Sequence, residues 1–195
     1  IDRVTPIIEA VKSRFDVPIS LDTYKSAVAE AGIAAGADLI NDIWGLKYDP
    51  KMAGVIAKGD VACCLMHNRD NSNYADFLTE WYDETAECVT LAKAAGIADD
   101  KIILDPGVGF GKTYEQNLIT IKYMDKLKTL GYPLLLGTSR KSVIGLTLDT
   151  PVTDRVLGTA VTTVFAVQQG YAFVRVHDIK ANKQAIQMTK AIMEA

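Results

Sequence analysis

Short apolar runs alternate along the chain with longer segments whose apolar residues recur every three or four positions. The short runs carry apolar side chains on both faces, which is typical of parallel strands covered by helices. The periodic segments between them predict helices. The six predicted strands are Val17–Leu21, Asp38–Ile43, Val61–Met66, Lys101–Leu104, Pro133–Gly137 and Ala172–Val176.

Some of the helices also have recognisable ends. Thr113 followed by Gln116 predicts a capping box at the start of a helix, and Gly131 predicts its end. Further helices are predicted at the start of the chain (Val4, Ile7, Ile8 and Val11), at Phe77–Ala95, at Pro151–Gln169 and at the end of the chain (Ile186 and Met193).

One helix followed by six strand–helix pairs predicts an α/β fold with a parallel sheet and right-handed crossovers. No linker or low-complexity segment interrupts the pattern, so we predict one domain over residues 1–195. Two architectures fit this order. One is a six-stranded doubly wound sheet, and the other is an eight-stranded barrel in which six strands are visible.

Polar residues at the carboxyl ends of the strands favour the barrel. In a (β/α)₈ TIM barrel all strand ends converge on one site, whereas in an open sheet the ends near the switch point matter most. Every predicted strand here ends in a polar group. These groups are Asp22, Asn41–Asp42, His67–Asn68, Asp105, Ser139–Lys141, and Arg175 with His177.

Each polar residue has a structural alternative. Asp22 also suits the cap of the following helix, beside Thr23. Asn41 lies within an apolar strand, where an unpaired amide is costly, so a ligand or a hydrogen-bond network is favoured. A lone histidine after a strand, such as His67, is usually a structural hydrogen-bonding residue.

The last strand carries two cationic candidates. Arg175 and His177 are two positions apart and therefore share one strand face. This is where barrels commonly bind phosphate. The alternative is an ion pair with Asp178 or another neighbour.

The glycine-rich stretch that begins at Asp105 resembles nucleotide-binding loops but fits neither standard pattern. A phosphate-binding loop needs glycine where Pro106 stands, and a dinucleotide fingerprint needs glycine where Lys112 stands. We interpret the glycines as a mobile, close-approach loop at the mouth of a site. Asp105 is kept extended by the following proline and can accept two parallel N–H bonds from an amidine-like ligand edge.

Composition narrows the function further. The chain has 195 residues and a formal net charge of −3 without a basic run, which argues against nucleic-acid binding. No apolar run reaches the ~18 residues that a membrane span needs. Cys63, Cys64 and Cys88 fit no metal-ligand spacing. We expect buried thiols and a cytoplasmic protein.

In combination, several motifs resemble the dihydropteroate synthase family over essentially the whole chain. They are ISLDTYKSAVAEAGIAAGADLINDIWG, CCLMHNR, ILDPGVGFGKTYEQNL, LLLGTSRKSVIG and FVRVHD, in this order. The resemblance implies a (β/α)₈ barrel and a homodimer. It implies condensation of 6-hydroxymethyl-7,8-dihydropterin pyrophosphate with p-aminobenzoate, with Mg²⁺ held by the pyrophosphate and no metal ligand among the residues of this chain.

The resemblance also implies a role for each matching residue. Asp22, Lys141, Arg175 and His177 are the expected catalytic residues, of which Asp22 would stabilise positive charge on the reacting methylene. The pterin would bind Asp105, Asn41, Asp22 and Lys141; Met66, Gly109 and Phe110 would line the pterin and aryl sites; Ser142, beside Arg140 or Lys141, would bind the p-aminobenzoate carboxylate; and Arg175 and His177 would bind pyrophosphate.

Two family motifs that precede these segments do not occur in the sequence, so we expect the chain by itself to be impaired as a synthase. Two other functions remain open. A methyltetrahydrofolate methyltransferase would share the Asp, Asn and Asp-Pro-Gly features, but it would not need Arg175, His177 or the SRKS segment. A non-catalytic pterin-binding module is the other alternative, which turnover measurements distinguish.

Overall fold

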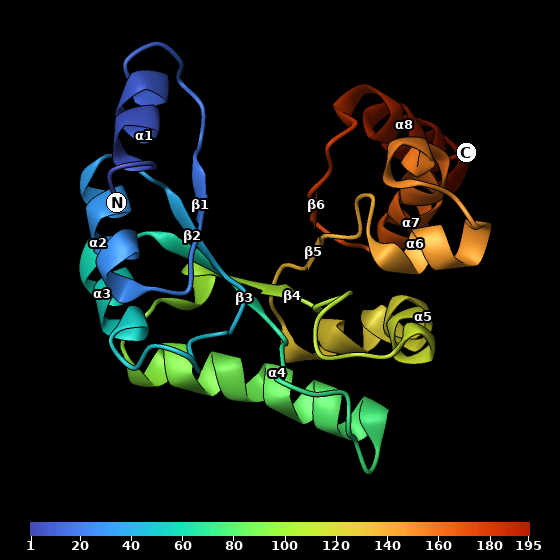
Figure 1. The fold of residues 1–195 in the computed structure, drawn as a ribbon, viewed down its shortest axis with the longest axis horizontal. Coiled ribbons are helices and arrows are strands. Elements are labelled where there is room, and N and C mark those ends of the chain that lie inside the picture. Colours follow the sequence, from blue (N-terminus) through green and yellow to red (C-terminus); the bar gives the residue numbers. More distant parts are fainter. The chain divides into compact units, whose positions relative to one another are not determined.

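The computed structural model describes residues 1–195 and has an α/β fold with parallel strand pairing (Figure 1). No helix is both long and apolar enough to cross a membrane. The strands are β1 (Ser20–Asp22), β2 (Leu39–Asp42), β3 (Ala62–Met66), β4 (Ile102–Asp105), β5 (Leu135–Leu136) and β6 (Phe173–Val174). The α-helices are α1 (Thr5–Lys12), α2 (Ser26–Ala34), α3 (Met52–Gly59), α4 (Phe77–Ala94), α5 (Tyr114–Tyr123), α6 (Ser142–Leu148), α7 (Val156–Gln168) and α8 (Ile179–Met193). Short 3₁₀ helices lie at η1 (Asp99–Lys101), η2 (Met124–Leu130) and η3 (Val152–Asp154).

The chain packs as two compact units. Unit 1 comprises Ile1–Asn68 with Asp83–Leu104, and unit 2 comprises Arg69–Tyr82 with Asp105–Ala195. The expectation of a single domain over residues 1–195 stays a prediction.

A parallel sheet with its strands in sequence order, β1-β2-β3-β4, organises unit 1 (Figure 1). In its register Asp22 lies opposite Asn41, and Asn41 lies opposite Cys64. The polar residues that end β1 and β2 are therefore neighbours at the same edge of the sheet, as expected for the carboxyl ends of parallel strands.

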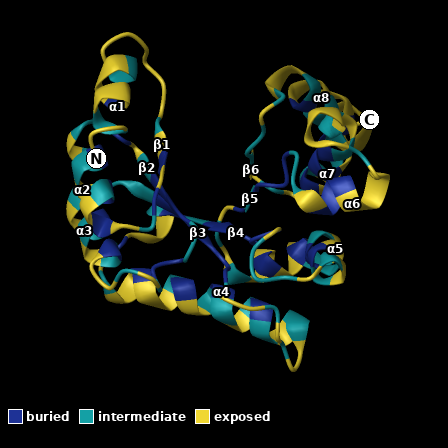
Figure 2. Cartoon of the chain, in the orientation of Figure 1, coloured by how far each residue is buried: buried dark blue, intermediate teal, exposed yellow.

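The central strands of this sheet are buried (Figure 2). The apolar residues Ile40 and Leu65 have no solvent-exposed surface. The helix predicted over Phe77–Ala95 is confirmed as α4, and Thr85, Cys88 and Ala92 on one of its faces are fully buried. Gly45 of the loop after β2 has φ +57°, and a Cβ there would lie 2.4 Å from the Cys88 sulfur, so only glycine fits.

In unit 2, β5 and β6 pair in parallel, with Leu135 opposite Phe173. Its apolar core takes residues from the glycine-rich loop, η2, β5, α6 and α7, namely Val108, Met124, Leu136, Val143, Ile144 and Ala166. The contact of α7 with α8 includes a buried hydrogen bond from Thr163 Oγ1 to Asn182 Oδ1 at 2.6 Å. Met193, which the pattern placed on an apolar helix face, is 56% exposed.

The structure refines several predicted boundaries. All six strands were placed correctly, but β1 begins only at Ser20, while Val17 is exposed. The capping box at Thr113 is confirmed, although the α-helix ends at Tyr123 and continues as η2 to the left-handed Gly131. The predicted helix Pro151–Gln169 is instead divided into η3 and α7.

The physical reason for this division is the side chain of Arg155. It donates hydrogen bonds to the carbonyl oxygens of Thr150, Arg140 and Lys141, and it crosses α6 at Gly145. A Cβ on Gly145 would lie 2.1 Å from its guanidinium. The periodicity of apolar residues in a sequence does not reveal hydrogen bonds of this kind from a single side chain.

Burial makes a chemical prediction for the cysteines. All three are free and buried, and desolvation raises the pKa of Cys63 and of Cys88 to about 12. Because the thiolate is the reactive form, we expect no labelling by Ellman's reagent at pH 8 in the native protein. Full labelling is expected in guanidinium chloride. Rapid labelling of the native protein would contradict the packing described for unit 1.

Candidate active site

Two residues of opposite charge, each at the carboxyl end of a strand, meet in unit 2. Asp105 is the last residue of β4, and Arg175 directly follows β6. The Asp105 carboxylate is 1% exposed; its Oδ2 lies 3.3 Å from Arg175 Nη2, and its Oδ1 accepts a bond from the Gly107 amide at 2.8 Å. A buried carboxylate needs such partners. Arg175 therefore does form an ion pair, which was the alternative to phosphate binding, and its partner is Asp105 and not Asp178.

Gly137, which directly follows β5, makes room for this pair. A Cβ at Gly137 would lie 2.6 Å from Arg175 Nη2 and 3.4 Å from Asp105 Oδ2. Gly137 was predicted only as the last residue of a strand, because a glycine carries no side chain that would indicate a role in a site.

The second cationic candidate, His177, is exposed and held by Ser139. Its Nδ1 lies 2.8 Å from Ser139 Oγ, and its backbone amide donates to the same oxygen at 3.1 Å. Ser139 thus fixes the imidazole through Nδ1, so that Nε2 is the ring nitrogen not engaged by Ser139. The sequence analysis placed Ser139 at a strand end but gave it no role of its own.

Asp178 pairs with Arg140 instead. The guanidinium donates to both carboxylate oxygens, at 2.9 Å from Nε and 2.6 Å from Nη2. This bidentate bond lowers the pKa of Asp178. Arg140, which the resemblance placed beside the p-aminobenzoate carboxylate together with Lys141, is thus engaged in an ion pair.

Lys141 reaches across the glycine-rich loop. Its ammonium donates to the carbonyl oxygen of Val108 and lies 4.6 Å from the centre of the Phe110 ring, a cation–π distance. A Cβ on Gly109 would lie 3.1 Å from the Lys141 side chain. Three of the predicted substrate-binding residues, Gly109, Phe110 and Lys141, are therefore brought together.

Ser142 is the first residue of α6 and is exposed. The residue before it, Lys141, occupies the N-cap position without a capping side-chain bond. Its role as a carboxylate-binding residue stays a prediction.

In unit 1, Asp22 and Asn41 are paired. Asn41 Nδ2 donates to Asp22 Oδ2 at 2.9 Å; Asn41 is 2% exposed, and Asp22 is exposed. Asp22 does not cap α2, because the amide of Ser26 donates instead to Asp49 at 2.8 Å. The alternative explanation of Asp22 as a helix cap is thus wrong.

Asp42 is a buried carboxylate that the sequence analysis gave no separate role. It is 1% exposed and accepts bonds from the amides of Trp44 and Leu46 at 2.9 and 2.8 Å. Burial raises the pKa of Asp42, and the two amides oppose this rise. Leu46 has a left-handed φ of +72°, so Asp42 supports a strained turn directly after Asn41.

The remaining strand-end residues of unit 1 are interior. Met66 ends β3 and has no exposed surface. His67 is also fully buried, and its Nε2 lies 2.9 Å from Glu84 Oε2. This supports the structural interpretation of His67, while the role of Met66 in lining a ligand site stays a prediction.

The residues of the described clusters do not fit a protein-held Mg²⁺. Mg²⁺ prefers several oxygen ligands in octahedral geometry, and no group of three or more His, Cys, Asp or Glu side chains is placed to hold a metal ion. The Asp105 carboxylate is already bonded to Arg175 and Gly107. Arg175 and His177 suit phosphate oxygens instead.

With this geometry described, comparison with known proteins defines the class. The sequence profile of the family described as pterin binding enzyme matches residues 1–177. The chain belongs to this pterin-binding enzyme family.

The particular relatives carry one name. The chain is 55% identical over 194 residues to the dihydropteroate synthase of Clostridium beijerinckii, covering 99% of this chain and 72% of that protein. It is 47% identical to the dihydropteroate synthase of Bacillus subtilis, covering 98% of this chain and 67% of that protein.

Similarity to a solved structure confirms the fold class. Dihydropteroate synthase from Clostridium difficile, crystallised in the presence of pteroic acid, superposes with a TM-score of 0.96 at 47% identity. The match covers 98% of this chain and 73% of that chain. The predicted TIM-barrel type is therefore confirmed.

The environment of Asp105 makes a direct binding prediction. In Asp105→Asn, the side-chain NH₂ group would replace one carboxylate oxygen. It would then face a donor, either the Gly107 amide, the Arg175 guanidinium or an N–H group of the pterin. We expect pterin affinity to fall by about 2–4 kcal/mol, or roughly 30- to 1000-fold. Calorimetric titration with a pterin analogue measures this, with Asp100→Asn, an exposed residue of η1, as the matched control. Equal affinity in wild type and Asp105→Asn would remove Asp105 from the site.

Proposed function

We propose that this chain catalyses the condensation of 6-hydroxymethyl-7,8-dihydropterin pyrophosphate with p-aminobenzoate to give 7,8-dihydropteroate and pyrophosphate. The observation that carries the proposal is the Asp105–Arg175 pair with His177 beside it in sequence, in a chain 55% identical to a dihydropteroate synthase. The Clostridium difficile relative was crystallised with pteroic acid, whose pterin and p-aminobenzoate parts are joined as in the proposed product.

The reaction needs a leaving group that departs readily, because an aryl amine is a weak nucleophile. The amine nitrogen forms a bond to the exocyclic methylene carbon, the carbon–oxygen bond breaks, and pyrophosphate leaves with the electron pair. The amine then gives up one proton. Groups that neutralise charge on the departing phosphate therefore lower the barrier.

Unit 2 offers side chains for each part of this chemistry. Asp105, with its position fixed by two bonds, would accept N–H bonds from the pterin edge. Arg175 and His177 would meet the pyrophosphate. Phe110 and Lys141 would lie at the aryl side, where a flat ring and an ammonium are already in contact.

In unit 1, the paired Asp22 and Asn41 are proposed to bind pterin ring nitrogens, with the Asp22 carboxylate also stabilising positive charge on the methylene. Mg²⁺ would enter with the substrate, bound by pyrophosphate oxygens, and supply additional positive charge there. We also propose a cytoplasmic protein, since its three free thiols suit a reducing compartment.

A methyltransferase of the related pterin-binding barrels is less well supported. A methyl transfer releases no pyrophosphate, so it gives no reason for Arg175 and the exposed His177 to stand at the end of the last strand. The second alternative, a pterin-binding module without activity, differs from the proposal in turnover alone.

Turnover therefore tests the proposal. The protein carrying this chain, and the chain fused to the preceding strands of the Clostridium beijerinckii relative, are incubated with both substrates and Mg²⁺. Dihydropteroate and pyrophosphate formed in equal amounts by either form support the proposal. Pterin binding without product in both forms would establish the non-catalytic alternative.

The leaving-group contacts give a prediction of their own. Because His177 and Arg175 would stabilise pyrophosphate, His177→Ala and Arg175→Ala should lower kcat by roughly 100-fold each. Both variants should also lose more binding affinity for the pyrophosphate-bearing substrate than for the bare pterin. Steady-state kinetics measures kcat, and calorimetry measures the two affinities. Arg14→Ala, at an exposed position, is the control. If both variants lost bare-pterin binding to the same extent, their role would be structural.

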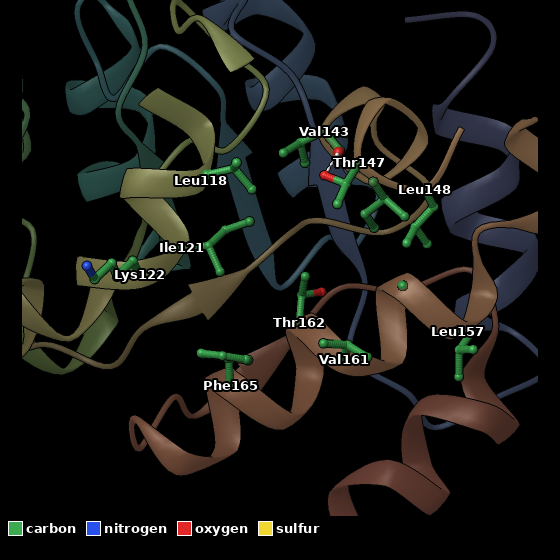
Figure 3. Close-up of a pocket in the computed structure, with 12 residues that line it drawn as sticks. Leu118, Ile121, Lys122, Val143, Thr147, Leu148, Leu157, Val161, Thr162 and Phe165 are labelled. Carbon is green, nitrogen blue, oxygen red and sulfur yellow. Dashed lines mark hydrogen bonds between the residues drawn. The ribbon is translucent and has the colours of Figure 1, made fainter. Parts of the chain in front are cut away.

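We further propose a homodimer, on the basis of an apolar groove in unit 2. The groove has a volume of about 590 Å³, and α5, α6 and α7 supply its walls (Figure 3). Leu157, Val161 and Phe165 of α7 are 77%, 52% and 44% exposed there. Contiguous exposed apolar surface marks an interaction site, and a self-complementary patch is the common basis of a two-fold dimer.

Changing one groove residue should separate the copies. We expect sedimentation equilibrium to give twice 21.2 kDa for the wild type and 21.2 kDa for Val161→Asp, because a carboxylate would be desolvated at the interface. Ile7→Asp, at a 64% exposed apolar position of α1, should remain dimeric. A monomeric wild type, or a dimeric Val161→Asp, would count against this face.

A further inference from the structure

The glycine-rich loop between β4 and α5 is held by side chains. Gly107, Gly109 and Gly111 have φ values of +72°, +88° and +54°. A backbone of this kind cannot continue a strand or a helix, so its polar groups need other partners. They find them: the carbonyl oxygens of Pro106 and Gly111 accept bonds from the indole of Trp81 and the hydroxyl of Tyr74, at 2.9 and 2.8 Å.

Lys112 is the side chain that spans the turn inside this loop. The amide of Phe110 donates to the carbonyl of Gly107 at 3.2 Å, which closes a turn. The Lys112 ammonium donates to both carbonyl oxygens at the two ends of that turn, to Gly107 at 2.9 Å and to Phe110 at 3.0 Å. One side chain thus fixes the first and last residues of the turn relative to each other.

The residues fixed in this way are those of the proposed aryl site. Phe110 ends the turn, and Lys141 lies against its ring and bonds to Val108 O, inside the turn. Gly109, also inside the turn, has its amide bonded to the buried Asn117 at 2.5 Å. Any opening of the turn moves the Phe110 ring and the Lys141 ammonium together.

We propose that Lys112 is a positioning residue that sets p-aminobenzoate affinity by holding the Gly107–Phe110 turn, without touching substrate. The inference rests on the proposed function for its kinetic consequence. Its structural part, the role of Lys112 in the closed turn, rests on the contacts of Lys112 with Gly107 and Phe110 and does not depend on the substrate.

The kinetic arm uses Lys112→Met, which keeps the aliphatic stem and removes the donors, and Lys112→Arg, which restores them. Because displacements of about 1 Å can cost up to 100-fold in rate, we expect Lys112→Met to raise the KM for p-aminobenzoate by about 10-fold or more. The pterin affinity of Lys112→Met should stay within about 3-fold of the wild-type value. Lys112→Arg should recover most of the loss, and Lys58→Met, at an exposed position of α3, should behave as wild type.

A second arm does not require turnover. Amide hydrogen exchange at Gly109 and Phe110 should become faster in Lys112→Met and remain slow in Lys112→Arg and Lys58→Met. Unchanged exchange in Lys112→Met would overturn the inference whatever the activity. If exchange became faster in Lys112→Met while the wild type formed no product, the turn would be held as inferred and the proposed function would fail.

Two kinetic outcomes also count against the inference. One is a KM for p-aminobenzoate unchanged in Lys112→Met. The other is a parallel loss of pterin affinity, p-aminobenzoate affinity and thermal stability, which would mean that Lys112 supports the fold and does not position the aryl site.

Discussion

The buried negative charge of Asp105 is the constraint around which unit 2 is organised. A carboxylate that is 1% exposed is costly unless it is paired and hydrogen-bonded, and here Arg175 and the Gly107 amide meet that need. Each partner imposes a further requirement. Arg175 fits because Gly137 has no side chain, and the Gly107 amide is available because the chain turns sharply after Pro106.

That sharp turn has consequences for the rest of the loop. Its glycines leave carbonyl oxygens without strand or helix partners, and lysine ammonium groups supply the donors. The cations of the site thereby divide into two kinds. Arg140 and Arg175 are paired with carboxylates, and Lys112 and Lys141 donate to loop carbonyls. His177 is exposed and is held by Ser139. A substrate with pyrophosphate at one end of its reacting bond suits such a distribution of positive charge.

Much of this arrangement was predictable from the sequence, because it follows from strand ends. The alternation of short apolar runs with longer helical segments placed every strand and brought Asp105, Arg175 and His177 to strand ends without any knowledge of contacts. The same argument placed Asp22 and Asn41 at strand ends, and the parallel register of β1 and β2 makes them neighbours.

The remainder depends on side-chain reach, which sequence periodicity does not encode. Arg155 divides a predicted helix because its guanidinium bridges carbonyls across Gly145. The pairing of Arg140 with Asp178 spans 38 positions, whereas proximity in the sequence suggested Asp178 only as an alternative partner for Arg175 and His177. Lys112 was noted only as the residue that breaks a nucleotide-binding pattern.

The position of bound pteroic acid tests the account most directly. In a crystal structure of this protein with pteroic acid, the account predicts that the pterin amidine edge lies within hydrogen-bond distance of both Asp105 carboxylate oxygens. It also predicts that the aryl ring lies at Phe110 and Lys141, with its carboxylate toward the start of α6. Pteroic acid bound with its pterin away from Asp105, in a structure where the Asp105–Arg175 pair is intact, would contradict it.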